Sequence, residues 1–149
     1  DSRLTIVEKI QLQDPEFNLH LIELDEISQY SLHADETALL FGTIQNRDLL
    51  RQALPELKKA DPDHKKIGHL LSAHHTILRD VLEVSTHKIE MMLDAAMNAG
   101  ALGGKINGSG GGGCMFAYVP QNPEMVVEAI KETGGEAYII HSEVGTKID

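Results

Sequence analysis

Apolar residues recur at helical spacing through most of the chain that precedes its glycine-rich segment. From Asp35 to Pro55 the apolar positions repeat at helical intervals and predict a helix, although Gly42 weakens the pattern. A stronger helix is predicted from about Asp63 to Val84, because one face is an apolar stripe and the other is polar. The stripe contains Ile67, Leu70, Leu71, His74, Leu78, Val81 and Leu82. Between these helices, Leu57 to Lys66 is predicted to form a charged turn.

A third helix is predicted to follow Ser85 as its N-cap and to end at Gly100. Its predicted buried residues are Ile89, Met92, Leu93, Ala96 and Met97. Near the N-terminus, Asn18 to Leu24 is compatible both with a short strand and with the start of a helix. The pattern does not decide between these two structures.

The periodicity changes after Gly100, where strands are predicted. Lys105 to Asn107 and Cys114 to Val119 are the first two, and the second should be buried because it is apolar on both faces. Asn122 and Pro123 are typical of a helix start, and Glu136 to His141 is a further predicted strand. The helix between them should turn Val126, Val127 and Ile130 inward and end at Gly134 and Gly135. This order predicts an α+β fold: a two-layer domain with an antiparallel, ferredoxin-like sheet covered by helices.

The segment from Gly103 to Cys114 holds seven of the thirteen glycines. A flexible linker is one interpretation, but both ends of the run lead into predicted strands, which favours a tight loop. Successive N–H groups in such a loop can bind an anion. The run is neither a Walker P-loop nor a dinucleotide fingerprint, because it lacks the Lys-Ser/Thr pair and precedes a strand. We expect a ligand-facing loop, with a purely structural hairpin as the alternative.

Composition limits the partners of this chain. Its formal net charge of −10, from 23 acidic and 13 basic residues, disfavours nucleic acid as a partner. Backbone amides can still bind phosphate, because they do not depend on net charge. No apolar stretch is long enough to cross a membrane, and the first residues do not resemble a signal peptide, so no membrane partner is expected. The single cysteine, Cys114, is expected to be a buried thiol in a cytoplasmic protein.

Other candidate side chains receive structural interpretations. The eight histidines show no metal-ligand spacing, so no metal site is predicted. His74 is expected to be a hydrogen-bonded core or interface residue, and Arg79 and Glu83 are expected to form a surface ion pair. Asp80 has no evident nucleophile or cation beside it that would make it a general base. Lys105 could either meet a phosphate or only flank the sheet.

Three stretches carry a resemblance to a known family. GGKINGSGGGGCMFAYV (103–119) resembles the third, C-terminal motif of the GHMP kinases, a family of small-molecule kinases. HHTILRDVLEVS (74–85) is similar to a stretch typical of the galactokinases within that family, and NRDLLRQALPEL (46–57) is similar to a galactokinase helix. The sequence departs from the family pattern at Asn107, where threonine is usual, and at His74, Ile77 and Leu82. Because of these departures, the resemblance does not specify which sugar would be the substrate.

The resemblance implies ATP-dependent phosphorylation of a sugar, most closely the C1 hydroxyl of galactose. A kinase for a heptose or fucose derivative is an alternative, and so is a non-catalytic sensor of sugar and ATP. Residues 1–149 would then be a single C-terminal domain that acts with an N-terminal kinase domain in cis. The absence of an initial methionine is expected if the chain is a fragment. The missing domain would supply the catalytic residues and most ligands of ATP and Mg²⁺, so the fragment alone should be inactive.

The resemblance also assigns the site residues. The loop expected to face the nucleotide phosphates comprises Gly108, Ser109, Gly110, Gly111, Gly112 and Gly113. Lys105 and Asn107 are further candidates for phosphate contact. No catalytic residue and no metal ligand is expected in this chain.

Overall fold

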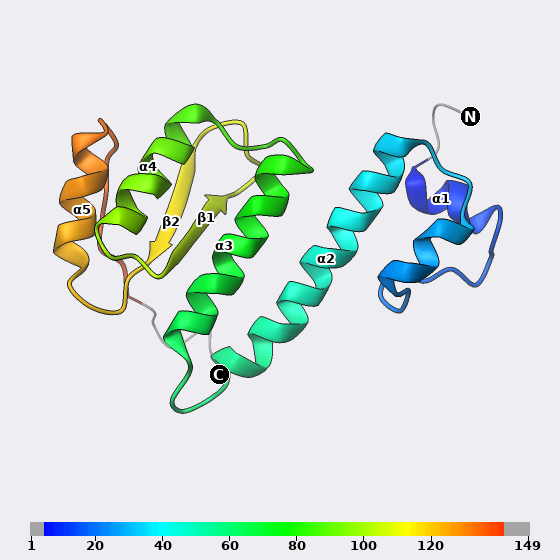
Figure 1. Cartoon of the computed structure of the whole chain (residues 1–149), viewed down its shortest axis with the longest axis horizontal. Coiled ribbons are helices and arrows are strands. Elements are labelled where there is room, and N and C mark those ends of the chain that lie inside the picture. The colour runs from blue at the N-terminus through cyan, green and yellow to red at the C-terminus, as the bar shows by residue number, and fades with distance from the viewer. Residues whose placement is uncertain (1–4, 142–149) are drawn as a thin grey trace, which may run out of the picture.

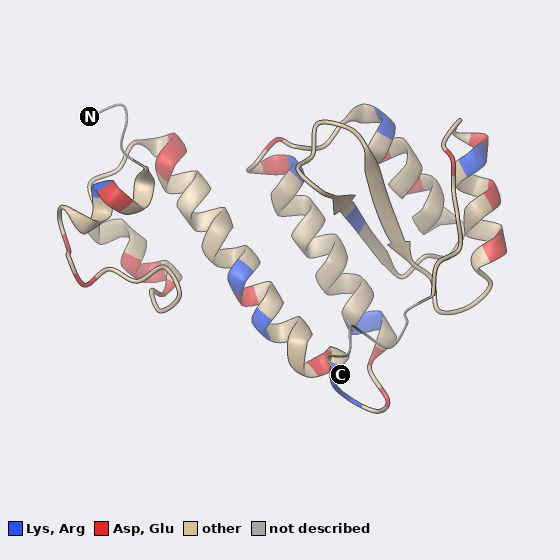
Figure 2. Cartoon of the chain, turned by 180° about the vertical axis from the view of Figure 1, so that it is seen from behind, with Lys and Arg blue, Asp and Glu red and all other residues tan. Residues whose placement is uncertain are grey.

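The computed structural model describes residues 5–141 and shows an α+β architecture in which helices lie around a small antiparallel sheet (Figure 1). Its elements, in chain order, are α1 (Ile6–Gln11), the 3-10 helix η1 (Leu24–Gln29), α2 (Ala34–Leu57), α3 (His64–Asp80), α4 (His87–Asn98), β1 (Gly103–Asn107), β2 (Cys114–Tyr118) and α5 (Pro123–Glu132). This order confirms the predicted fold class. Figure 2 shows both signs of charge along α2 and several acidic residues on α5.

The residues before α2 pack on the first half of that helix, at the end of the molecule away from the sheet (Figure 1). Ile10, Phe17, Ile22 and Ile27 from this part of the chain form an apolar cluster with Leu40 and Ile44 of α2. The segment from Asn18 to Leu24 is neither strand nor α-helix, and Leu24 begins η1. The Asn18 side chain accepts the His20 N–H at 2.9 Å, and its carbonyl accepts the Leu21 N–H at 2.9 Å. These local hydrogen bonds favour a turn over either predicted element.

Helices α2 and α3 pack against each other across the predicted turn, which is confirmed. The buried carboxylate of Glu56 fixes this turn: it accepts the Asp63 backbone N–H at 2.9 Å and pairs with Lys59 and Lys66. The prediction that the second helix reaches Val84 is wrong, since α3 ends at Asp80. Glu83 adopts a φ of 51°, a left-handed conformation that a helix cannot continue through.

The sheet pairs β1 with β2 in antiparallel register, from Gly103 opposite Tyr118 to Asn107 opposite Cys114. One face packs on α4 and α5 through Ile106 and its neighbours on β2. The core on this face contains Ile89, Met92, Leu93, Ala96, Ala101, Ile106, Val126 and Ile130. The prediction that β2 is buried on both faces is wrong: Cys114 is exposed and the rest of the strand is half-buried.

The helices that cover this face differ from prediction at a few positions. Thr86, not Ser85, is the N-cap of α4, and its hydroxyl accepts the Ile89 N–H. Met97 is 42% exposed rather than buried. Asn122 and Pro123 begin α5 as predicted.

The predicted strand at Glu136–His141 is wrong: the structure assigns it no strand, and two of its apolar side chains, Tyr138 and Ile140, are 77% and 81% exposed. Within residues 5–141 the sheet therefore contains only β1 and β2, and the rest of a ferredoxin-like sheet is not seen there. The Ser142–Asp149 tail lies outside the described residues.

Strand β1 approaches α3 so closely that only glycine fits at the contact. A Cβ on Gly68 would lie 2.2 Å from the Leu102 carbonyl oxygen, and one on Gly103 would lie 1.9 Å from the Gly68 oxygen. Side chains of α3 also accept backbone N–H groups of β1: Ser72 from Gly104 at 3.4 Å and His75 from Ile106 at 3.2 Å. Helix α3 thus covers the edge of β1 that β2 leaves free, and it fixes the strand that enters the glycine-rich loop.

Candidate functional site

The glycine-rich loop of residues 108–113 joins β1 to β2 in a backbone conformation that requires glycine. Every loop residue except Ser109 has a positive φ, from 74° at Gly111 to 132° at Gly112. L-amino acids with a side chain rarely adopt these angles, so the glycine content follows from the geometry of the loop. The loop is open: a Cβ at Gly108, Gly111, Gly112 or Gly113 would meet no heavy atom within 4 Å.

One point in the middle of the loop is anchored. The Gly111 N–H donates to the carbonyl oxygen of Val84 at 2.7 Å, and a Cβ on Gly110 would lie only 2.6 Å from the same oxygen. Among the described residues, no other amide of the loop donates a hydrogen bond. The loop therefore has one anchored point at its centre, and its other backbone donors have no acceptor among the described residues.

The anchor brings together the two sequence stretches that carried the family resemblance. Val84 belongs to the 74–85 stretch, in the connection between α3 and α4, whereas Gly111 belongs to the third motif. The Val84 N–H donates to Leu78 at 3.0 Å, which holds this connection against the end of α3. The sequence alone gave no sign that the two stretches touch.

A hydrogen-bonded network around Glu90 supports the same connection. The Glu90 carboxylate accepts a hydrogen bond from Ser85 Oγ, lies 2.9 Å from His75 Nε2 and lies 3.4 Å from Arg79 Nη1. Burial raises the pKa of Glu90, but the hydrogen bonds from Ser85 and His75 outweigh it, so the pKa is lowered and the group is ionised at neutral pH. Sequence reasoning missed Glu90, because it lies on the next helix, outside the stretches that carry the family resemblance.

Arg79 does not pair with Glu83, so the predicted surface ion pair is wrong. Its guanidinium instead contacts Asp80, with Nε 2.6 Å from Oδ1, and reaches Glu90. The hydrogen bond to Asp80 is the main cause of a raised pKa at Arg79 and of a lowered pKa at Asp80. Because α3 ends at Asp80, Glu83 is no longer one helical turn from Arg79.

His75, rather than His74, is the buried hydrogen-bonded histidine of α3, with 6% of its surface exposed. Its Nδ1 accepts the Ile106 N–H, so the ring proton belongs on Nε2, which donates to Glu90. His74 is half-buried, and burial lowers its pKa, with a further contribution from Lys105. The helical stripe placed His74 inward, one position away from the residue that the fold buries.

Lys105 and Asn107, the two further candidates, lie just before the loop. The Lys105 ammonium donates to the Ile106 carbonyl at 2.7 Å and lies 5.5 Å from the centre of the Phe116 ring, and burial lowers its pKa. It therefore rests on the sheet instead of reaching over the loop. Asn107 is exposed, with its amide nitrogen 3.9 Å from the Cys114 sulfur.

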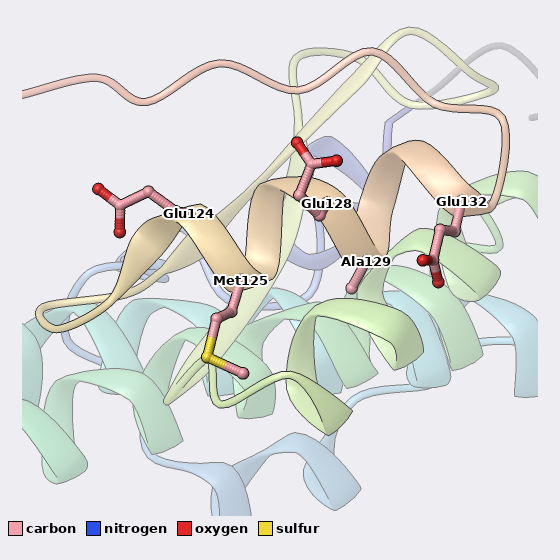
Figure 3. A pocket seen from close by; sticks show the side chains of 5 residues that line it. All are labelled: Glu124, Met125, Glu128, Ala129 and Glu132. Atoms are coloured by element: carbon pink, nitrogen blue, oxygen red, sulfur yellow. The ribbon is translucent and has the colours of Figure 1, made fainter.

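The loop offers donors but does not enclose a ligand. A hollow of about 750 Å³ lies between α2 and α3, and a shallower one of about 440 Å³ lies on α5, lined by Glu124, Met125, Glu128, Ala129 and Glu132 (Figure 3). No residue of the 108–113 loop lines either hollow. Over residues 5–141 there is no group of three or more histidine, cysteine or acidic side chains that could hold a metal ion. None of the helices in this range has the length and apolar character of a membrane span.

Comparison with known proteins identifies the domain. Residues 50–136 match the family model described as GHMP kinases C terminal. The mevalonate kinase of Pyrococcus abyssi is 42% identical over 96 residues, which is 62% of this chain and 28% of that protein. The galactokinase of Mycobacterium bovis is 39% identical over 61 residues, which is 41% of this chain and 17% of that protein.

The fold comparison agrees with these matches. The structure of Lactococcus lactis galactokinase complexed with galactose superposes with a TM-score of 0.63 over 85% of this chain and 34% of that one. At 22% identity this likeness concerns the fold alone. The chain spans about a quarter of the length of the mevalonate kinases that it matches. These matches confirm the resemblance to the GHMP kinases, and the chain belongs to the GHMP kinase C-terminal family.

Proposed function

We propose that this chain is the C-terminal domain of an ATP-dependent small-molecule kinase, in which the 108–113 loop contacts the nucleotide phosphates. The observation that carries the proposal is the anchored loop itself, whose centre is tied to Val84 while its other amides have no acceptor in the described part of the chain. Phosphoryl transfer depends mainly on positioning and on stabilising the charge of the transferred group. Backbone donors beside an anchored point suit that task, because the anchor restricts how far they can move.

The open side of the loop is compatible with a phosphate ligand. A Cβ placed on Gly108, Gly111, Gly112 or Gly113 would have no heavy atom within 4 Å, so a ligand can approach the backbone closely there. The loop itself contains no carboxylate that could bind Mg²⁺. We therefore assign Mg²⁺, the catalytic base and most of the ATP contacts to an N-terminal kinase domain in the same protein. The nucleotide would supply the transferred phosphoryl group.

We propose galactose as the phosphate acceptor. The support is the 74–85 stretch, which is similar to the galactokinase stretch and contains Val84, the residue that accepts the Gly111 N–H. Mevalonate is the second candidate, because the mevalonate kinase of Pyrococcus abyssi matches a longer segment, 96 residues against 61, at slightly higher identity. A kinase for another sugar and a non-catalytic sensor remain as further outcomes of the test.

The test is ADP formation by the full-length protein with ATP and either galactose or mevalonate. We expect kcat/KM for galactose to exceed that for mevalonate by on the order of 100-fold or more, because a site built to hydrogen-bond sugar hydroxyls rejects a ligand that lacks them. A preference for mevalonate would favour the second candidate. ATP binding with no turnover of any acceptor would favour the sensor. ADP formation by the 149-residue chain alone would contradict the assignment of catalysis to another domain.

A further inference from the structure

Glu90 lies where α3, the connection between α3 and α4, and α4 itself meet. Its carboxylate accepts hydrogen bonds from His75 and Arg79 on α3 and from Ser85 in the connection between α3 and α4. Glu90 itself is in the first turn of α4, so one side chain joins two helices and their connection. Hydrogen bonds to an ionised carboxylate are roughly twice as strong as those between neutral groups.

Two chains of contacts lead from Glu90 to the loop. In the first, Glu90 orients His75, and His75 Nδ1 accepts the backbone N–H of Ile106, two residues before the loop begins. In the second, Glu90 holds Ser85, whose neighbour Val84 accepts the Gly111 N–H at 2.7 Å. One carboxylate is therefore connected both to the entry of the loop and to its centre.

We propose that Glu90 is the positioning residue of the 108–113 loop, which it fixes through His75 at the entry and through Ser85 and Val84 at the centre. The proposal rests on the proposed function in one respect, since the positioned loop is taken to serve the nucleotide phosphates. Glu90 does not itself touch the loop, so it acts on the ligand only through the backbone that it orients. Its loss would leave every loop donor in place but loosen the loop, so the cost of ordering the loop should fall on ATP binding before it affects the chemical step.

The experiment uses Glu90→Gln in the full-length protein, a change that keeps the shape of the side chain and removes its charge. Glu128→Gln is the matched control, because Glu128 carries the same charge, is exposed on α5 and pairs only with nearby Lys131 among the described residues. We expect Glu90→Gln to raise the KM for ATP about tenfold with a smaller change in kcat. We also expect faster amide hydrogen exchange in the peptide that contains Gly111, measured without nucleotide. The control should change neither.

A second variant tests the proposal independently in case Glu90→Gln does not fold. Ser85→Ala removes only the branch that leads to Val84, so it should loosen the centre of the loop while the Ile106 amide keeps its protection. Unchanged exchange in the loop peptide of both variants would overturn the proposal. Faster exchange with an unaltered KM for ATP would also overturn it, because the positioned loop would then not serve the nucleotide. A parent protein without kinase activity would refute the proposed function instead, and the exchange rates would still decide whether Glu90 positions the loop.

Discussion

Replacing Gly111 with valine should separate the contribution of the loop to activity from its contribution to stability. Gly111 has a φ of 74°, and a Cβ there would meet no heavy atom within 4 Å. The substitution therefore creates no clash at the Cβ, and its direct cost is the left-handed backbone conformation. That cost is about 1–2 kcal/mol for a residue with a side chain, and a β-branched residue lies at the upper end.

The stability cost converts into a modest thermal shift. For a domain of about 150 residues, 1 kcal/mol lowers Tm by about 2–4 °C, so Gly111→Val should lower the Tm of this domain by about 2–8 °C. The effect on turnover should be larger. The new side chain would stand among the loop amides, and losing one positioned donor to a transition-state oxyanion typically costs about 10²–10³ in kcat.

Gly100→Val provides a matched control for this experiment. Gly100 also has a positive φ, 106°, and a Cβ there would also meet nothing within 4 Å, but it lies between α4 and β1, at the opposite end of β1 from the loop. Calorimetry and initial rates of ADP formation should be measured on the full-length protein. Tm should fall by a similar amount in both variants, whereas kcat should fall only in Gly111→Val. Equal losses of turnover in the two variants would refute the reasoning that the loop faces the phosphates.

Two further predictions concern the scaffold that supports the site. Gly68→Ala should lower the free energy of unfolding by about 1–3 kcal/mol, because the alanine Cβ would lie 2.2 Å from the backbone oxygen of Leu102. Urea unfolding measures this change, and an unchanged midpoint would contradict the close contact. The hydrogen bond from Lys59, together with that from the Asp63 N–H, lowers the pKa of Glu56 from 4.5 to about 2. The stability that ionised Glu56 contributes is therefore fully present above pH 4.5 and is lost as the pH falls towards 2. Glu56→Gln should flatten the stability curve over that range, and parallel curves for parent and variant would be evidence against it.

Much of the fold could be predicted from local sequence patterns. Helices α2, α3 and α4 followed from apolar spacing, and the start of α5 followed from Pro123 at its first helical position, whereas α1 and η1 were not predicted. The loop between β1 and β2 followed from glycine content, because positive φ angles over consecutive residues are accessible to glycine at little cost. Each of these features depends on residues that are neighbours in the chain.

The features that could not be predicted depend on contacts between distant segments. The burial of His75 instead of His74 depends on how α3 is rotated against β1, where Ile106 supplies the hydrogen bond. The partner of Arg79 depends on the end of α3 and on Glu90 of the next helix. The strand expected at Glu136–His141 has suitable residues, but strand formation requires a neighbouring edge, and the structure shows no pairing for it within the described range.

The energetics of the loop explain why its anchor matters. Fixing six backbone residues carries a conformational-entropy cost that is largest for glycine, and the hydrogen bond from Gly111 to Val84 offsets only part of it. Pairing of Asn107 with Cys114 fixes the two ends but not the residues between them. In the proposed function, a polyanion that accepts several backbone N–H groups at once would offset a further part of this ordering cost. A loop retained only as a hairpin would gain nothing from a run of glycines this long, because a two-residue turn would join the same strands at a lower entropic cost.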